Sequence, residues 1–157
     1  MQEIKTFKQS ELVLKINRAY NTNRLDLSAW KPYINRLCGD RVYQKEAIEA
    51  AIIYLASGQY TALKDLAEYN YSLNTCLRDK YSSLEEFTKA LQMKNKLYAT
   101  IDLATGTGKS YVMYGISQIA LGLGIVKRVL VLCPSLTIES RNKVILGIGR
   151  TFLSCCR

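Results

Sequence analysis

The sequence is organised around Leu97-Tyr-Ala-Thr-Ile-Asp-Leu-Ala-Thr-Gly-Thr-Gly-Lys-Ser-Tyr111. Its apolar part, 97–103, is typical of a β-strand, the small residues 104–108 indicate a glycine loop, and a helical pattern starts at Lys109. Glycines let backbone N–H groups turn inward around an anion, and a following helix directs its positive end at the same charge. The order strand, glycine loop, helix therefore predicts a phosphate-binding loop.

Each polar residue at the end of this loop has a predicted role. Lys109 would reach the β- and γ-phosphates of a nucleotide, and the Ser110 hydroxyl would bind Mg²⁺. Leu103 stands where the Walker A pattern G-x-x-x-x-G-K-[ST] has its first glycine, so a Gly-rich turn with a solvated lysine is the alternative. The neighbouring strand and helix patterns favour phosphate binding. The candidate nucleotide-binding residues of the loop are Thr105, Gly106, Thr107, Gly108, Lys109 and Ser110.

Composition narrows the class of protein. The 157 residues are 48% apolar and 22% charged, which is typical of one globular domain. Lysines and arginines number 22 against 13 aspartates and glutamates, and the resulting charge of +9 favours a polyanionic partner such as nucleic acid. A basic surface that serves only solubility is the alternative.

The rarer residue types exclude several kinds of chemistry. The chain has five cysteines without a C-x-x-C pair and no histidine, so neither a disulfide framework, a tetrahedral zinc site nor His-based acid–base catalysis is indicated. It has no apolar run of the roughly 18 to 20 residues that a membrane span needs, and no apolar segment typical of a signal peptide. We therefore expect a cytoplasmic protein without a membrane partner.

Hydrophobic patterns on either side of the loop predict the remaining elements. Apolar residues at helical spacing predict the strongest helix over 41–56, and 57–95 indicates a helical insertion with two short helices, the second starting at a capping box of Ser83 and Glu86. A further helix should run from Lys109 to Gly122. The near-continuous apolar run 128–133 predicts a strand buried on both faces of a parallel sheet, so the fold class is α/β with a βαβ unit.

Three segments in this order resemble the N-terminal RecA-like domain of superfamily 2 (DEAD/DEAH-like) helicases, most closely the helicase (Res) subunit of type III restriction enzymes. They are Arg41-Val-Tyr-Gln44, Leu103-Ala-Thr-Gly-Thr-Gly-Lys-Ser110 and Val129-Leu-Val-Leu-Cys-Pro-Ser-Leu136. The resemblance implies a partial RecA-like P-loop NTPase domain over 41–139. Residues 1–40 would be an N-terminal helical lead-in and 140–157 an atypical basic tail.

The resemblance also implies roles for residues outside the loop. Gln44 would read the adenine edge, with Arg41 and Tyr43 framing the base. The cofactors would be ATP and Mg²⁺, and the partners would be DNA and, in the full-length system, a candidate modification or specificity subunit. The residues that would contact the nucleic-acid backbone are Pro134, Ser135 and Thr137.

The implied function is the ATP-binding front portion of an ATP-dependent DNA helicase or translocase. We expect a reading frame that is truncated or shifted after about residue 140, because the segment that follows lacks a helical stripe; a natural basic tail that contacts nucleic acid is the alternative. The DExH motif and second RecA-like domain that hydrolysis needs are missing here, so we expect this chain to bind ATP without turning it over. The competing hypotheses are a non-catalytic nucleic-acid-binding remnant and, ranked last, a P-loop kinase or other small NTPase.

Overall fold

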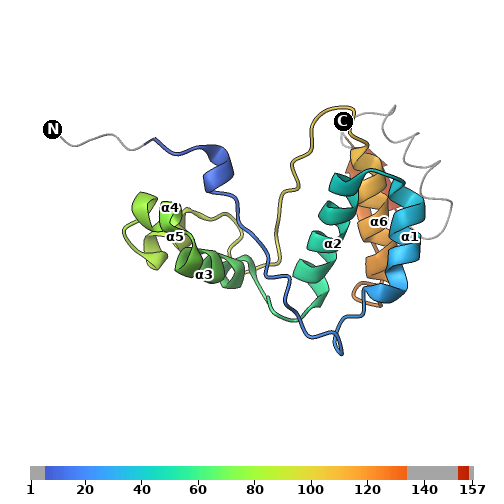
Figure 1. Cartoon of the computed structure of the whole chain (residues 1–157), viewed down its shortest axis with the longest axis horizontal. Helices are drawn as coiled ribbons and strands as arrows, with labels where there is room; N and C mark the ends of the chain where they lie inside the picture. Colours follow the sequence, from blue (N-terminus) through green and yellow to red (C-terminus); the bar gives the residue numbers. More distant parts are fainter. Residues whose placement is uncertain (1–5, 134–151, 156–157) are drawn as a thin grey trace.

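The computed structural model describes residues 6–133 and 152–155, and these contain six α-helices and one parallel pair of strands (Figure 1). No helix in these ranges is long and apolar enough to cross a bilayer. The helices are α1 (Lys31–Cys38), α2 (Val42–Ala56), α3 (Leu63–Leu73), α4 (Thr75–Lys80), α5 (Leu84–Ala90) and α6 (Lys109–Gly122), and the strands are β1 (Leu130–Cys133) and β2 (Phe152–Cys155).

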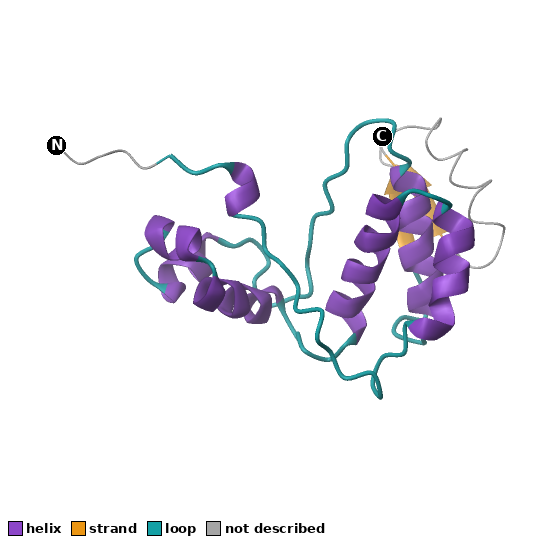
Figure 2. Ribbon diagram, in the orientation of Figure 1, coloured by secondary structure: helices purple, strands orange, loops and turns teal. Residues whose placement is uncertain are grey.

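The elements form two groups, which Figure 2 shows on opposite sides of a set of loops. The main lobe contains α1, α2, α6 and the strands, and the helical lobe contains α3, α4 and α5. In the main lobe, Ile48 and Ile52 of α2 are fully buried with Ile119 of α6. A Cβ atom added at Gly115 would lie 2.6 Å from Cδ1 of Ile48, so the absent side chain lets α6 approach α2 closely. The helices predicted at 41–56 and from Lys109 are confirmed.

The strand predicted at 128–133 is confirmed as β1, which pairs in parallel with β2 so that Leu130 is opposite Phe152. Val131 is buried against Met113 and Tyr114 of α6. Leu130, however, is 60% exposed. The prediction that this strand is buried on both faces is therefore wrong at Leu130.

Residues 97–103 are not a strand, and this prediction was wrong together with the βαβ unit built on it. The segment is irregular and runs alongside α2 (Figure 1), with Tyr54 Oη donating to the carbonyl of Tyr98 at 3.2 Å. Leu97 and Ile101 are 38% and 42% exposed, and Leu103 packs on the main core. A strand needs a neighbour for its backbone hydrogen bonds, and β1 pairs with β2 instead. Because the described residues are mostly helical, the α/β fold class stays a prediction.

The helical lobe confirms the short helices predicted within 57–95 and adds a third. Its core contains Ala67, Leu77 and Phe87, and the ring of Phe87 lies 5.0 Å from that of Tyr81 between centroids. The additional helix, α4, has six residues, of which only Leu77 is buried. A helix this short has no apolar stripe in the sequence, so hydrophobic periodicity could not predict it.

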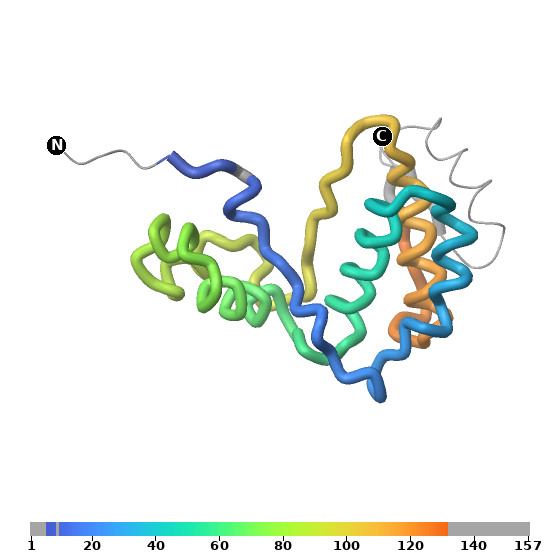
Figure 3. The backbone as a smooth tube through the Cα atoms, in the orientation of Figure 1, coloured from blue at the N-terminus to red at the C-terminus, as the bar shows by residue number. Residues whose placement is uncertain are grey.

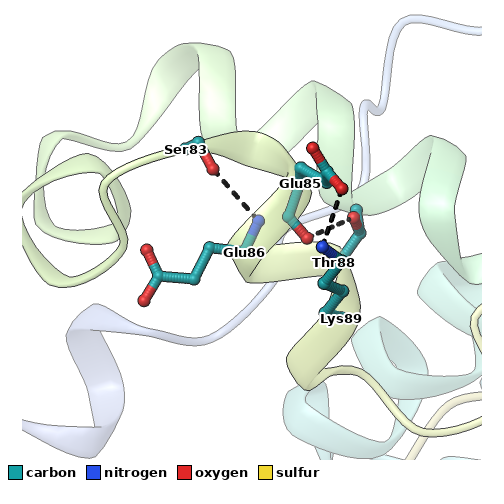
Figure 4. A network of polar contacts seen from close by, with 5 residues as sticks. All are labelled: Ser83, Glu85, Glu86, Thr88 and Lys89. Atoms are coloured by element: carbon teal, nitrogen blue, oxygen red, sulfur yellow. Dashed lines mark hydrogen bonds and ion pairs between the residues drawn. The ribbon is translucent and has the colours of Figure 1, made fainter.

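The start of α5 differs by one residue from the predicted capping box. Ser83 Oγ accepts a hydrogen bond from the Glu86 N–H at 3.1 Å, as predicted (Figure 4). The Glu86 carboxylate, however, accepts from the N–H and the hydroxyl of Ser82 rather than from the N–H of Ser83. Lys89 and Glu85 form an ion pair of 2.7 Å one turn apart on the same helix. Side chains at both sides of the first turn therefore stabilise this short helix.

Asp65 fixes the start of α3 and makes the helical lobe sensitive to acid. Its carboxylate accepts from the hydroxyl and N–H of Thr61 and the N–H of Ala62, and these bonds, the Thr61 hydroxyl first, lower the pKa of Asp65. The stabilisation is complete above the ordinary carboxyl pKa and is lost as pH falls through the lowered value. We expect the urea midpoint to fall between about pH 5 and pH 3. The decrease should be smaller in Asp65→Asn, and an equal decrease would contradict this role.

An N-terminal segment, 12–27, with a turn at 22–24 but neither helix nor strand, joins the two lobes (Figure 3). Ile16 packs on apolar clusters of both lobes, and Leu25 and Leu27 are buried in the main core. The segment leads into α1, on which Ile34 and Cys38 are buried. The predicted lead-in is therefore helical only in its last part, apart from short 3₁₀ turns at Gln9–Glu11 and Ser28–Trp30.

Candidate phosphate-binding loop

Two glycines set the conformation of the loop that precedes α6. Gly106 has φ of 82°, and Gly108, the N-cap of α6, has φ of 78° and ψ of 42°. Only glycine adopts such left-handed conformations without strain. A Cβ atom at Gly106 would meet nothing within 4 Å, whereas one at Gly108 would lie 2.6 Å from Nε2 of Gln44. The backbone therefore faces open space at Gly106 and packs on a side chain at Gly108.

The first turn of α2 holds the loop through the carbonyl of Thr107. This oxygen accepts hydrogen bonds from Nε2 of Gln44 at 2.6 Å and from Oη of Tyr43 at 3.0 Å. Gln44 is fully buried, whereas Tyr43 is 41% exposed. Two side chains more than sixty residues away in sequence thus fix this peptide group from one side.

The carbonyl of Ala104 is the second acceptor within the loop. It accepts from Thr107 Oγ1 at 2.6 Å and from Lys109 Nζ at 3.2 Å. The Lys109 side chain is therefore folded back over the loop and exposed to solvent. A phosphate oxygen carries negative charge and is a stronger acceptor for an ammonium than a neutral carbonyl is. Lys109 can thus exchange its carbonyl partner for a phosphate.

The groups around the loop fit a nucleoside triphosphate with Mg²⁺. The N-terminal end of α6, the glycine backbone and the Lys109 ammonium all favour an anion. Ser110, half-buried in the first turn of α6, supplies a hydroxyl. Within the described ranges no three His, Cys, Asp or Glu side chains form a metal site. Mg²⁺ is commonly bound by few protein oxygens together with substrate phosphates, so Ser110 with a triphosphate is a suitable ligand set.

The other predicted site residues are only partly brought together. Thr105 is exposed in the loop, and Arg41 is exposed directly before α2. Sequence reasoning missed Ala104, because its contribution is a backbone carbonyl that no side-chain pattern reveals. The predicted nucleic-acid contacts lie outside the described residues; they are Pro134, Ser135 and Thr137.

Replacing Gln44 by leucine should release the loop from α2. The variant loses the shorter bond to Thr107, and a net hydrogen bond is worth about 1 kcal/mol, so we expect amides 105–108 to exchange with solvent roughly 5-fold faster. Hydrogen exchange followed by NMR would measure the change. Gln92→Leu, on an exposed turn, is the matched control. Unchanged exchange at these amides in a folded Gln44→Leu sample would show that the bond does not restrain the loop.

One protein-family model matches the part of the chain that contains this loop. The model of the res subunit of type III restriction enzymes matches residues 38–152, which is well over half of the chain. The match includes α2, the loop, α6 and β1. It also extends to residue 152, whereas the sequence predicted that the family-like region ends at residue 139. No curated protein and no solved structure matches the chain. On the strength of the family match, the chain belongs to the type III restriction enzyme res subunit family.

Proposed function

We propose that this chain is the ATP-binding portion of an ATP-dependent DNA helicase or translocase, and that its loop 105–110 binds ATP with Mg²⁺. Membership of the res subunit family supports a helicase-like, ATP-dependent function with a RecA-like P-loop fold. The observation that carries the proposal is the pair of left-handed glycines directly before α6, with Lys109 beside them. These features together are what an anionic triphosphate requires.

Within this proposal the loop is already prepared for an anion. The carbonyl oxygens of Ala104 and Thr107 carry partial negative charge that would repel an anion. Both accept hydrogen bonds from protein side chains, which offsets this charge. Lys109 leaves the carbonyl of Ala104 and pairs with the phosphates, and Ser110 offers its hydroxyl to Mg²⁺. In the full-length protein, ATP held here would supply the phosphoanhydride bond whose hydrolysis is coupled to movement along DNA.

Gln44 links the loop to recognition of the base. Its Nε2 atom is committed to the carbonyl of Thr107, whereas its Oε1 atom is buried without a hydrogen-bond partner in the described part of the chain. A buried amide oxygen without a partner is costly, and a ligand that donates a hydrogen bond would satisfy it. The amino group of adenine is such a donor. Arg41 and Tyr43, at the exposed start of α2, would frame the ring.

The partner in this proposal is DNA. The excess of 22 basic over 13 acidic residues supports binding to a polyanion. Pro134, Ser135 and Thr137 would contact the nucleic-acid backbone, and a modification or specificity subunit would complete the system. Such a protein would work in the cytoplasm.

Titration with ATP and Mg²⁺ tests the proposal. The amide signals of residues 106–110 should shift in NMR spectra of the folded chain, whereas signals of the helical lobe should not. A folded sample whose loop signals stay unmoved would refute nucleotide binding. The charge of +9 favours one competing function, a nucleic-acid-binding remnant without ATP turnover. Salt-dependent DNA binding that is indifferent to ATP and unchanged in Lys109→Ala would favour that alternative.

A further inference from the structure

The N-terminal residues 11–19, which we name the strap, lie against the helical lobe; after the 3₁₀ turn that ends at Glu11 they form neither a helix nor a turn. From Leu12 to Ile16 the side chains alternate between half-buried and exposed. Leu12, Leu14 and Ile16 pack against the apolar clusters of α3, α4 and α5. Val13 is 54% exposed and Lys15 is exposed. This period of two is that of a β-strand, although no strand of the described chain pairs with it.

Side chains of the helical lobe hydrogen-bond the strap backbone in place of a neighbouring strand. Asn70 is 4% exposed and makes two of the bonds to one residue, Lys15, as a backbone partner in a sheet would. All the bonds join a side chain of residues 59–74 to a main-chain group of the strap: Asn74 Nδ2 to Glu11 O (2.7 Å), Lys15 N to Asn70 Oδ1 (2.7 Å), Asn70 Nδ2 to Lys15 O (2.9 Å), Asn17 N to Tyr60 Oη (2.9 Å) and Gln59 Nε2 to Ala19 O (2.6 Å).

This combination is the chemistry of peptide recognition. Bonds to the main chain hold any extended segment, and apolar pockets at alternate positions select its side chains. We propose that the helical lobe is a receptor for an extended polypeptide with apolar residues at alternate positions, and that the strap is its built-in, releasable ligand. The receptor surface consists of Gln59, Tyr60, Asn70 and Asn74 with the apolar residues between them.

The degree of burial differs between the strap, which contacts the helical lobe, and the residues after it, which are buried in the main lobe. Leu12, Leu14 and Ile16 of the strap are half-buried, and the hydrogen bonds of the strap to the lobe are partly buried or exposed. Beyond the strap, Leu25 and Leu27 are only 2% and 5% exposed in the main core. The strap can therefore leave the helical lobe while it remains tethered to the main lobe. A tethered ligand of this kind competes at an effective concentration on the order of millimolar.

Binding of a labelled peptide to the full chain tests the proposal. The probe is a fluorescent synthetic peptide of residues 9–20, and fluorescence anisotropy measures its affinity. In the native chain the tethered strap competes with it. Leu14→Asp in the chain places a charge against apolar side chains and weakens the strap, so this variant should bind the peptide at least ~10-fold more tightly than the native chain does.

Matched variants separate specific docking from general loosening. Val13→Asp in the chain changes the exposed neighbouring residue and should leave peptide affinity at the native value. A peptide that itself carries Leu14→Asp should bind none of the three chains. The proposal is overturned if the native-sequence peptide fails to bind a Leu14→Asp chain that keeps its helical circular dichroism, or if Val13→Asp raises the affinity as much as Leu14→Asp does.

Hydrogen exchange in the native chain supplies a second test, which holds even if Leu14→Asp fails to fold. The amides of Lys15 and Asn17 donate to the receptor surface and should exchange through local release of the strap. We expect them to be protected at least ~10-fold less than the amide of Ile52 in α2. Equal protection would mean that the strap leaves only when the whole protein unfolds, and it would overturn the proposal.

Discussion

Replacing Lys109 by alanine is expected to weaken the binding of ATP with Mg²⁺ by about 10- to 100-fold, because a hydrogen bond to a charged group is worth roughly 1.5–3 kcal/mol. The ammonium lies over the loop, 3.2 Å from the carbonyl of Ala104, and is free to turn toward a phosphate. Isothermal titration calorimetry on the folded chain would measure the affinity. Because Lys109 is exposed, the urea midpoint should stay unchanged.

The control for this experiment removes the same charge elsewhere. Lys127 is exposed in the loop that leads to β1, outside the glycine loop. Lys127→Ala should therefore bind ATP as the native chain does. If both variants lost affinity equally, the effect would come from net charge. If neither variant lost affinity, Lys109 would have no part in binding the phosphates.

The largest effect on stability should come from the contact between α2 and α6. Ile48 is fully buried there, so Ile48→Ala should lower the free energy of unfolding by about 2–5 kcal/mol. Gly115→Leu should also destabilise, by roughly 1–3 kcal/mol, because even a Cβ atom at this position would lie 2.6 Å from Cδ1 of Ile48. Urea denaturation followed by circular dichroism would measure both changes.

The double variant Ile48→Ala, Gly115→Leu tests whether the side chains at these two positions contact each other. Ile48→Ala removes the closest of the atoms that Gly115→Leu would strike, whereas Leu37 Cδ2 stays 3.0 Å from the added Cβ position. The pair should therefore be more stable than the sum of the single effects predicts, by about 0.5–3 kcal/mol. Val42→Ala, at a 61% exposed position of α2, is the control and should change stability by no more than about 0.5 kcal/mol. Strict additivity of Ile48→Ala and Gly115→Leu would mean that the helices do not meet at this point.

Local patterns in the sequence predicted the elements whose burial depends on their own residues. The apolar stripe that contains Ile48 and Ile52 predicted α2, and the glycines before Lys109 predicted a turn directly followed by a helix. The run 97–103 contains Tyr98, Thr100 and Ile101, which suit a strand, yet it is irregular. Propensity shows that a segment suits a sheet, whereas a strand forms only where another strand offers its backbone.

The sequence pointed to the residues that surround the loop, but it did not predict the hydrogen bonds between them. Gln44 was singled out as a reader of adenine, and the structure places its Nε2 atom on the carbonyl of Thr107. Neither the backbone acceptor nor the burial of the side chain has a signal in the sequence. The strap went unrecognised for a similar reason. Its alternating residues around Leu14 were visible, but its partners are side chains such as Asn70 on a helix.

The hydrogen bond from Tyr54 to Tyr98 has a consequence for the architecture of this protein. The polypeptide departs from the main lobe and comes back to it at neighbouring points, although more than forty residues separate them along the chain. An excursion that starts and finishes in one place can lengthen or shorten without pulling on the rest of the molecule. The long interval between Gln44 and Thr107 therefore does not affect the contact between these two residues, and the length of the intervening helical lobe can change in evolution.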